Sequence, residues 1–175
     1  ADGKEGWFPA ADLDGRHPRA VHESLVDGNL LADPAGGGLF YTTDNGLFRL
    51  NLATLVEEEL DSNHLRSLTA SSSDLYFIPV DHIGIPSSTP SILKWTAGDT
   101  AQLIDEDAWK GGLPRALAWG DDRLHCVDLL GMLSTVSSDG ATTEPLAIIP
   151  DAIKLSLRSA YFQQSTRSLY FAAFV

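Results

Sequence analysis

Three arginines recur at one position of a shared sequence pattern, and they have the clearest capacity for binding chemistry. Arg66, Arg115 and Arg158 each stand at the head of a segment that continues with small and apolar residues, a polar turn and an apolar strand. A guanidinium group is always charged, and it can hold a carboxylate or a phosphate through two parallel hydrogen bonds. A fold that placed the three positions on one circle would therefore create a basic ring for an anionic ligand.

Four aspartates recur at a second position, where an apolar strand ends. An aromatic or aliphatic residue stands four positions before each, and a glycine follows two or three residues later; they are Asp12, Asp44, Asp81 and Asp128. The last three can pair with the repeated arginines in a lattice between repeats, or they can accept backbone N–H groups in the turns. The similar numbers of arginines and aspartates favour the lattice over a free basic ring.

Histidine, tryptophan and cysteine provide weaker candidates. His82 and His125 occupy near-equivalent positions of the pattern, so a repeat could bring them together as metal ligands. Because a third ligand is missing, we expect no metal or other cofactor. Trp95 and Trp109 would suit sugar stacking or a protein contact if they were exposed, although packing between repeats is the simpler role. Cys126 lies in an apolar run and is expected to be a buried small hydrophobe.

Composition narrows the class of partner. The chain has 175 residues and a formal net charge of −12. This charge argues against nucleic acid or an anionic membrane as the main partner, because both are bound through Lys and Arg. No apolar run approaches the roughly 18 residues that a transmembrane helix needs. The sequence also lacks the Gly-x-Ser-x-Gly, P-loop and His-Glu-x-x-His motifs, so it points to no common enzyme reaction.

The repeated arginines and aspartates belong to a longer repeat of short strands. The apolar residues four positions before the aspartates serve as anchors of the repeat: Phe8, Phe40, Phe77 and Leu124. Phe171 is the anchor of a fifth copy, and the spacings between successive anchors are 32, 37, 47 and 47 residues. Segments of alternating apolar residues, bounded by turn residues, lie between these anchors and predict β-strands. The clearest hairpin is 38–52, where two alternating runs flank Asp44-Asn45-Gly46, because Asn-Gly is a strong turn signal.

Each unit therefore holds about four short strands. The predicted fold is all-β, a β-propeller of four-stranded antiparallel blades, with about four repeats plus a partial fifth in a single domain over 1–175. The predicted units are approximately 7–38, 39–74, 75–123 and 124–168, with a partial unit at 169–175. One four-stranded unit cannot bury both of its faces, so neighbouring units must stack on each other.

Two stretches resemble the YWTD-type propellers of the low-density-lipoprotein-receptor class B repeats. Tyr41-Thr42-Thr43-Asp44 is similar to the Tyr-Trp-Thr-Asp strand of that family, with Thr in the Trp place. Residues 12–25 are similar to the Asp-Gly turn and to the strand that follows it. The other units keep the spacing from an apolar residue to Asp, as NHL-type and gluconolactonase-type propellers also do. The resemblance implies a propeller that is used mainly for binding and is usually closed by six blades.

Because about four units are fewer than six, we expect a fragment or a ring completed by other chains, rather than a small self-closed ring. The expected function is a non-enzymatic binding or assembly module that uses its rim and loops for protein–protein or ligand recognition. The expected location is extracellular or periplasmic. A protein partner, other chains that complete the ring, and a small anionic or sugar ligand are the expected partners. The alternative is a lactonase-like hydrolase or lyase with a metal site of histidine and carboxylate ligands at the channel mouth.

Overall fold

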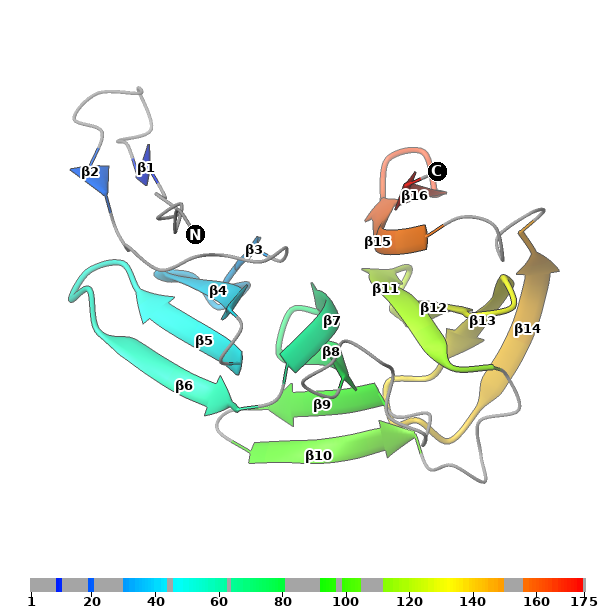
Figure 1. Cartoon of the computed structure of the whole chain (residues 1–175), viewed down its shortest axis with the longest axis horizontal. Helices are drawn as coiled ribbons and strands as arrows, with labels where there is room; N and C mark the ends of the chain where they lie inside the picture. The colour runs from blue at the N-terminus through cyan, green and yellow to red at the C-terminus, as the bar shows by residue number, and fades with distance from the viewer. Residues whose placement is uncertain are drawn as a thin grey trace, which may run out of the picture. The chain divides into compact units, whose positions relative to one another are not determined.

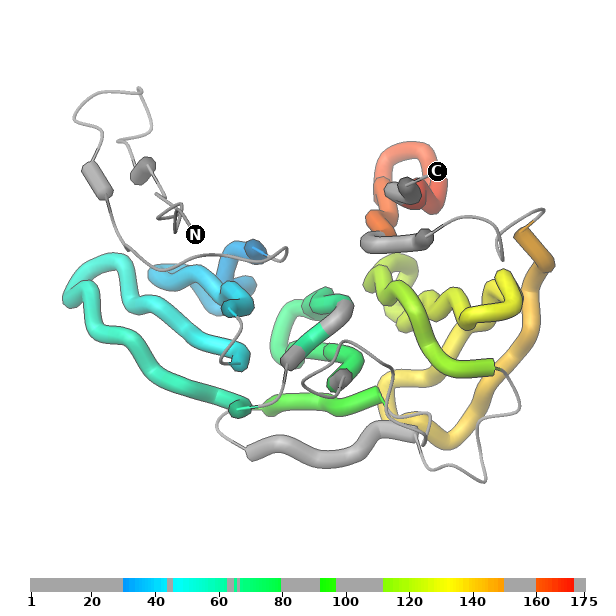
Figure 2. Tube along the Cα trace, in the orientation of Figure 1, coloured from blue at the N-terminus to red at the C-terminus, as the bar shows by residue number. Residues whose placement is uncertain are grey.

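A computed structural model of the chain describes strands joined by turns and loops (Figure 2). The described residues are 9–10, 19–20, 30–43, 46–62, 64–80, 92–96, 99–104, 112–149 and 156–174. The chain divides into two compact units, Ala1–His64 and Leu65–Val175, and each is considered by itself. The described part of the chain contains no helix that is long and apolar enough to cross a membrane.

The first unit contains a four-stranded antiparallel sheet of consecutive strands, β3 (Leu30–Ala32), β4 (Gly38–Thr43), β5 (Gly46–Asn51) and β6 (Glu57–Asp61) (Figure 1). The short strands β1 (Pro9–Ala10) and β2 (Arg19–Ala20) pair with each other. The predicted hairpin is confirmed as β4–β5, with Thr43 opposite Gly46 beside the turn. Gly46 is required there, because its φ is +138° and a Cβ would lie 2.1 Å from the Asp61 carbonyl oxygen.

The second unit contains two more sheets of four consecutive strands and a final hairpin. The first sheet comprises β7 (His64–Ala70), β8 (Asp74–Val80), β9 (Ile92–Thr96) and β10 (Asp99–Ile104). The second comprises β11 (Pro114–Gly120), β12 (Arg123–Asp128), β13 (Met132–Val136) and β14 (Thr143–Ile148). The hairpin is β15 (Ser156–Gln163) with β16 (Ser168–Phe174). The predicted all-β, antiparallel class is therefore confirmed.

The three four-stranded sheets share a β-bulge in their fourth strand. The extra residue is a leucine each time: Leu60 in β6, Leu103 in β10 and Leu146 in β14, at intervals of 43 residues. A bulge at the same place in each register indicates that the three sheets are copies of one structural unit. The boundaries of the predicted repeat units do not coincide with those of the sheets. The units 39–74 and 75–123 each begin in the second strand of a sheet and end after the first strand of the next sheet.

Apolar residues on both faces of the strands form the core. In the first unit, Phe40, Tyr41, Leu47 and Leu50 are buried. In the second unit, one buried cluster joins the β7–β10 and β11–β14 sheets and consists of Tyr76, Ile78, Ile92, Leu117, Leu124, Cys126 and Val136. Burying one such large side chain contributes about 1.5–3 kcal/mol. Burial also raises the pKa of the Cys126 thiol, so the prediction of a buried small hydrophobe is confirmed.

Two aromatic stacks join neighbouring sheets of the second unit. Tyr76 of β8 stacks on Trp119 of β11 with ring centroids 5.1 Å apart and planes 4° apart. His125 of β12 stacks on Phe162 of β15 with centroids 5.0 Å apart and planes 9° apart. Each stack joins the second strand of one sheet to the first strand of the next. The seams between sheets are therefore copies as well, and each stack adds about 0.5–1.5 kcal/mol beyond its buried area.

Candidate ligand-binding rim

The candidate site lies at the end of the second-unit sheets where first strands begin and second strands end. We call it the arginine rim and define it by Arg66, Arg115, Arg158 and the turn at Asp128. In the β11–β14 sheet, Pro114 lies opposite Asp128 and Ala116 lies opposite Val127, so Arg115 is the extra residue of a β-bulge. The two sequence-predicted residues Arg115 and Asp128 are thus brought to the same end of adjacent strands.

The bulge recurs at the next repeated arginine. Leu157 lies opposite Ala173 and Ser159 lies opposite Ala172, which leaves Arg158 as the extra residue of β15. Arg66 is the third residue of β7. The side chains of Arg66 and Arg158 lie outside the described part of the structure, so the rim is defined at these two positions by the backbone.

The first strands of the three second-unit sheets are neighbours. The Ser67 hydroxyl of β7 accepts a hydrogen bond from the Leu117 backbone N–H of β11, with a donor–acceptor distance of 3.0 Å. The Thr69 hydroxyl accepts one from Trp119 N–H at the same distance. β15 in turn lies beside β11 (Figure 1). The three arginine positions therefore lie at the same end of three neighbouring first strands.

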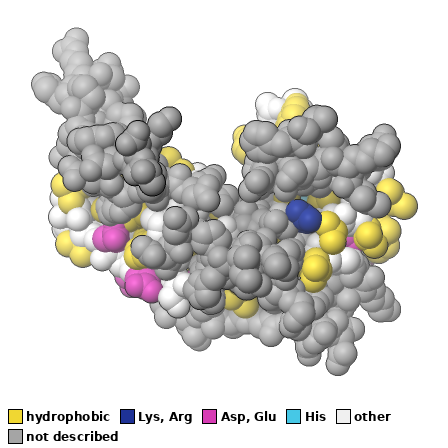
Figure 3. Space-filling view, viewed as in Figure 1, with side chains coloured by type: hydrophobic (Ala, Val, Ile, Leu, Met, Phe, Trp, Pro, Cys, Tyr) yellow, Lys and Arg dark blue, Asp and Glu magenta, His cyan; other side chains and the backbone are white. Residues whose placement is uncertain are grey.

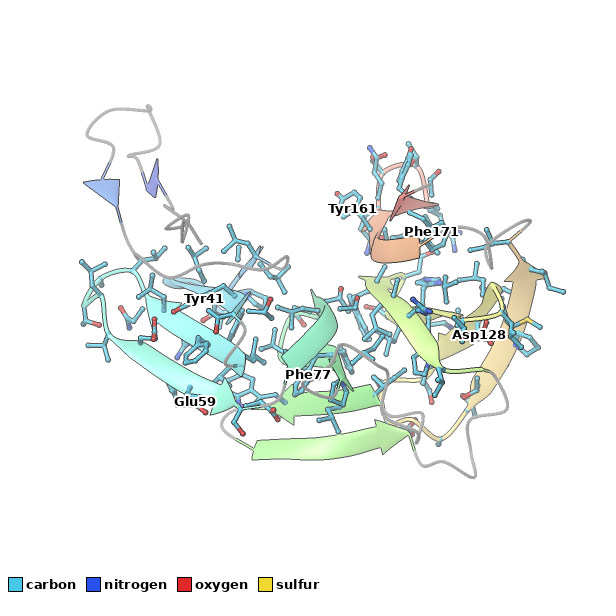
Figure 4. All side chains as sticks on the ribbon, in the orientation of Figure 1. Tyr41, Glu59, Phe77, Asp128, Tyr161 and Phe171 are labelled. Carbon is cyan, nitrogen blue, oxygen red and sulfur yellow. The ribbon has the colours of Figure 1, made fainter. Side chains whose placement is uncertain are left out.

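Asp128 organises the turn at the rim (Figure 4). Its side chain is buried, and its Oδ1 accepts hydrogen bonds from the backbone N–H groups of Leu130 and Met132, both at 2.8 Å. Its Oδ2 accepts the Gly112 N–H at 2.6 Å. Gly131 completes the turn with a φ of +84°. Of the two roles expected for the aspartates, backbone acceptance is the one seen at Asp128; Asp44 and Asp81 lie outside the described residues.

Acid–base pairs occur at the other end of the sheets, where the first strand turns into the second. Three aspartates in these turns hold a basic side chain with N–O distances of 2.7, 3.3 and 2.7 Å: Asp33 with Arg49, Asp74 with Lys94, and Asp121 with Arg167. The sequence prediction had not identified these pairs. A repeated basic residue is the sequence signal that could have predicted two of them. Arg49 and Lys94 occupy equivalent positions in the third strands of their sheets, opposite Phe40 and Tyr76.

The pair of Asp74 and Lys94 affects the pKa values of the groups around it. Burial alone would raise the pKa of Asp74, but hydrogen bonds from Thr96 and Ser73 and the charge of Lys94 outweigh it and lower the pKa. Burial and the Asp74 charge raise the pKa of Tyr76 to about 12. Lys94 also lies 5.9 Å from the Tyr76 ring centroid, within cation–π range. The basic groups at this end are thus engaged internally.

His125 has a role in packing. Its ring lies in the seam against Phe162, its Nε2 is 3.3 Å from the Gly120 carbonyl oxygen, and burial lowers its pKa. Its buried Nδ1 has no hydrogen-bond partner among the described residues. In the part of the chain that the structure covers, no three His, Cys, Asp or Glu side chains are grouped closely enough to hold a metal. His82, the other histidine of the predicted pair, lies outside that part.

Of the two tryptophans predicted as binding residues, the structure describes Trp95. Trp95 is half-buried in β9, opposite Leu75 of β8 and Thr100 of β10. Trp109 lies outside the described residues. Trp119, in contrast, is placed clearly, and it occupies the seam between two sheets. Packing between repeats is therefore the observed role for Trp119, and a surface role for Trp95 and Trp109 stays a prediction.

Neither a protein-family model nor a curated protein sequence matches the chain. Solved structures do. An auxiliary nutrient binding protein from Bacteroides ovatus is similar with a TM-score of 0.67 and 9% identity, over 94% of this chain and 42% of that one. The WD40 domain of Pan2 from Neurospora crassa is similar with a TM-score of 0.68 and 9% identity, over 95% of this chain and 54% of that one.

A third similar structure is the extracellular domain of a hybrid two-component system from Bacteroides thetaiotaomicron. It has a TM-score of 0.59 and 13% identity, over 98% of this chain and 21% of that one. The chain thus spans between a fifth and about half of the length of these three proteins. At such identities the likeness shows the fold alone. Together with the repeated four-stranded sheets, it establishes a β-propeller-type fold.

Proposed function

We propose that the chain is part of a β-propeller binding module of the YWTD-like class and that the arginine rim is its ligand site. The observation that carries the proposal is the β-bulge at Arg115 and again at Arg158. A bulge redirects the side chain of the extra residue, and bulges are common at the rims of barrels and beside active sites. Both bulged positions hold an arginine, whose guanidinium group can bind a carboxylate or a phosphate.

The ligand class that fits this rim is a small carboxylate or phosphate, such as an acidic sugar. Guanidinium groups recognise these anions with charge-assisted, paired hydrogen bonds. The chain carries a net charge of −12, so an anion needs a local basic site in order to bind. Asp128 would support the site indirectly, because it fixes the turn and the Gly112 backbone beside Arg115.

The remaining predicted residues complete this proposal. Arg66 extends the rim on β7, and Asp44 and Asp81 are proposed to organise their turns as Asp128 does. Trp95 and Trp109 are proposed as stacking surfaces for a sugar ring or a protein partner. An extracellular or periplasmic location is proposed by analogy, because similar solved structures include the extracellular domain of a hybrid two-component system and an auxiliary nutrient binding protein. Protein partners or further chains that complete a ring belong to the same proposal.

The test compares two Arg→Gln variants of one sheet, with citrate and galacturonate as probes. Arg115→Gln should weaken probe binding, measured by titration calorimetry, by about tenfold, as expected for the loss of a charged hydrogen bond. Arg123→Gln is the control, because Arg123 is 57% exposed, pairs with Glu144 and lies at the other end of the sheet. Binding that is absent in the unmodified chain, or equally weak in both variants, contradicts the proposal.

Urea unfolding of the same variants distinguishes ligand binding from the purely structural lattice. If Arg115 serves the ligand, Arg115→Gln weakens probe binding under conditions in which urea unfolding shows that the variant is folded. A large loss of stability with unchanged probe binding would instead support the lattice between repeats.

A further inference from the structure

The turn between β12 and β13 presents two leucines at the arginine rim. Leu129 and Leu130 follow Asp128 directly and are 37% and 60% exposed. Turns favour Gly, Pro, Asn, Asp and Ser, which supply special backbone angles and local hydrogen bonds, and the first repeat has such a polar sequence at 44–46. Here Asp128 supplies the hydrogen bonds and Gly131 supplies the positive φ of +84°. The geometry of the turn therefore does not require leucine at either position.

Backbone hydrogen bonds tie this turn to the chain on both sides. The Leu129 N–H donates to the Leu113 carbonyl oxygen, just before β11, at 2.8 Å. The Gly131 carbonyl oxygen accepts the Ile149 N–H, just after β14, at the same distance. Ile148, the last residue of β14, is exposed as well. A turn that is already fixed loses little conformational freedom on binding, which favours the affinity of its side chains for a partner.

The exposed leucines lie beside the positive charge of the rim. A Cβ on Gly112 would lie 3.3 Å from Leu130 Cγ, so this leucine lies against the backbone that leads into β11. Arg115 follows three residues later and is half-buried. In the space-filling view, a basic side chain lies beside hydrophobic ones over the β11–β14 sheet (Figure 3). The rim thus combines an apolar surface with a guanidinium group.

We call Leu129, Leu130 and Ile148 the apolar rim. Neighbouring apolar side chains that are exposed and bordered by polar groups are typical of surfaces that bind proteins or membranes. A small hydrophilic anion would contact the guanidinium group of Arg115 and leave the leucines in water. A ligand that covers both features needs an apolar group next to its negative charge. An anionic membrane fits poorly, because it repels a chain with a net charge of −12.

We propose that the carboxylate bound at the rim belongs to a protein segment in which a large apolar side chain stands next to an Asp or Glu. The apolar side chain packs on Leu129 and Leu130, and the carboxylate binds Arg115 through charge-assisted hydrogen bonds. The leucines then select this partner over other anions, because they are removed from water only when the partner brings an apolar group. The inference rests on the proposed anion site and names the partner of that site.

A library of random short peptides displayed on phage, selected on the full chain, tests the class of partner. Selected peptides should be enriched in Leu, Ile, Phe or Trp directly beside Asp or Glu. This outcome is discriminating, because the net charge of −12 by itself would select basic peptides. Enrichment of basic peptides, or no enrichment, overturns the proposal.

Variants of the chain then locate the contact, with one selected peptide measured by fluorescence polarisation. Leu130→Ser should weaken binding by about tenfold, as expected for the loss of one buried leucine contact. Val56→Ser is the matched control, because Val56 is 62% exposed and lies between β5 and β6 of the first unit. It should keep the affinity within about threefold of the unmodified chain. Circular dichroism verifies that both variants fold, and an equal effect of the two changes overturns the proposal.

Citrate separates this inference from the anion site on which it rests. Leu130→Ser should bind citrate within about threefold of the unmodified chain, because a small hydrophilic anion does not need the leucines. Citrate binding together with peptide binding that ignores Leu130→Ser overturns the protein partner and leaves the anion site standing. Peptide binding that requires Leu130, without citrate binding, supports the partner and contradicts the site for small anions.

Vesicles of phosphatidylcholine test the membrane as the other occupant of the apolar rim. The unmodified chain should stay in solution when the vesicles are sedimented. Co-sedimentation that Leu130→Ser abolishes overturns the proposal, because the leucines would then contact lipid instead of a protein segment.

Discussion

Gly120 is the position where the smallest substitution should have a large and interpretable effect. It is the last residue of β11, and the Phe162 ring of the next sheet packs directly on it. A Cβ added at Gly120 would lie 2.0 Å from Phe162 Cδ1 and 2.1 Å from Cγ. Carbon atoms in contact are normally about 3.5–4.0 Å apart. Gly120→Ala therefore requires the ring to move by roughly 1.5–2 Å, or the two sheets to separate.

The ring has little freedom to move. Phe162 is 8% exposed, and its ring also stacks on His125 with centroids 5.0 Å apart. Overpacking of this kind costs about 1–3 kcal/mol. Complete loss of the ring's packing would cost about 3–5 kcal/mol, which is the upper limit. Alanine in a strand otherwise gains about 0.5–1 kcal/mol over glycine. The difference leads us to expect that Gly120→Ala lowers the free energy of unfolding by about 0.5–2 kcal/mol.

Urea unfolding followed by circular dichroism, with an unchanged m-value, measures this loss. The decisive comparison is a double-mutant cycle with Phe162→Ala. Without the ring there is no clash, so Gly120→Ala should become neutral or slightly stabilising in that background. A coupling energy of about 1–3 kcal/mol is expected. The same loss with and without the ring would refute the packing of β15 on β11, and a loss below about 0.5 kcal/mol would refute the clash itself.

Two further predictions concern the rim turn and the seam. Asp128→Ala removes the buried carboxylate that accepts three backbone N–H groups, and it should cost about 3 kcal/mol of unfolding free energy. Asp139→Ala, in an exposed turn, is the control, and a similar effect of both changes would contradict the structural role of Asp128. For His125, burial lowers the folded pKa below the unfolded value of about 6.5, so the unfolded state binds more protons between the two values. Stability is therefore complete above about pH 6.5 and declines as the pH falls toward the folded pKa. His125→Phe keeps a ring in the seam and should lose stability less steeply from pH 7 to pH 5 in urea titrations; parallel profiles of the two proteins would show that His125 is not desolvated.

Local features of the sequence were sufficient for the strands and for the hairpin β4–β5. Alternation of apolar and polar residues places side chains on two faces of a strand, and Asn-Gly favours a tight turn, so both signals act within a few residues. The burial of Cys126 followed from the same local apolar run. The repeated arginines were also visible, because a repeat preserves the residue type at each equivalent position. Their bulges were not, since a bulge is a property of the register between two strands.

The ion pairs and the ring stacks depend on contacts between distant parts of the chain. Asp33 meets Arg49 only because a third strand returns beside the turn that follows the first. Tyr76 meets Trp119 only because two sheets pack face to face. The sequence alone determined an all-β chain of repeated short strands with arginines at one repeated position. The tertiary structure decided which charges neutralise each other, that Asp128 holds backbone N–H groups, and which rings stack between sheets, because these outcomes depend on strand register and on the stacking of sheets.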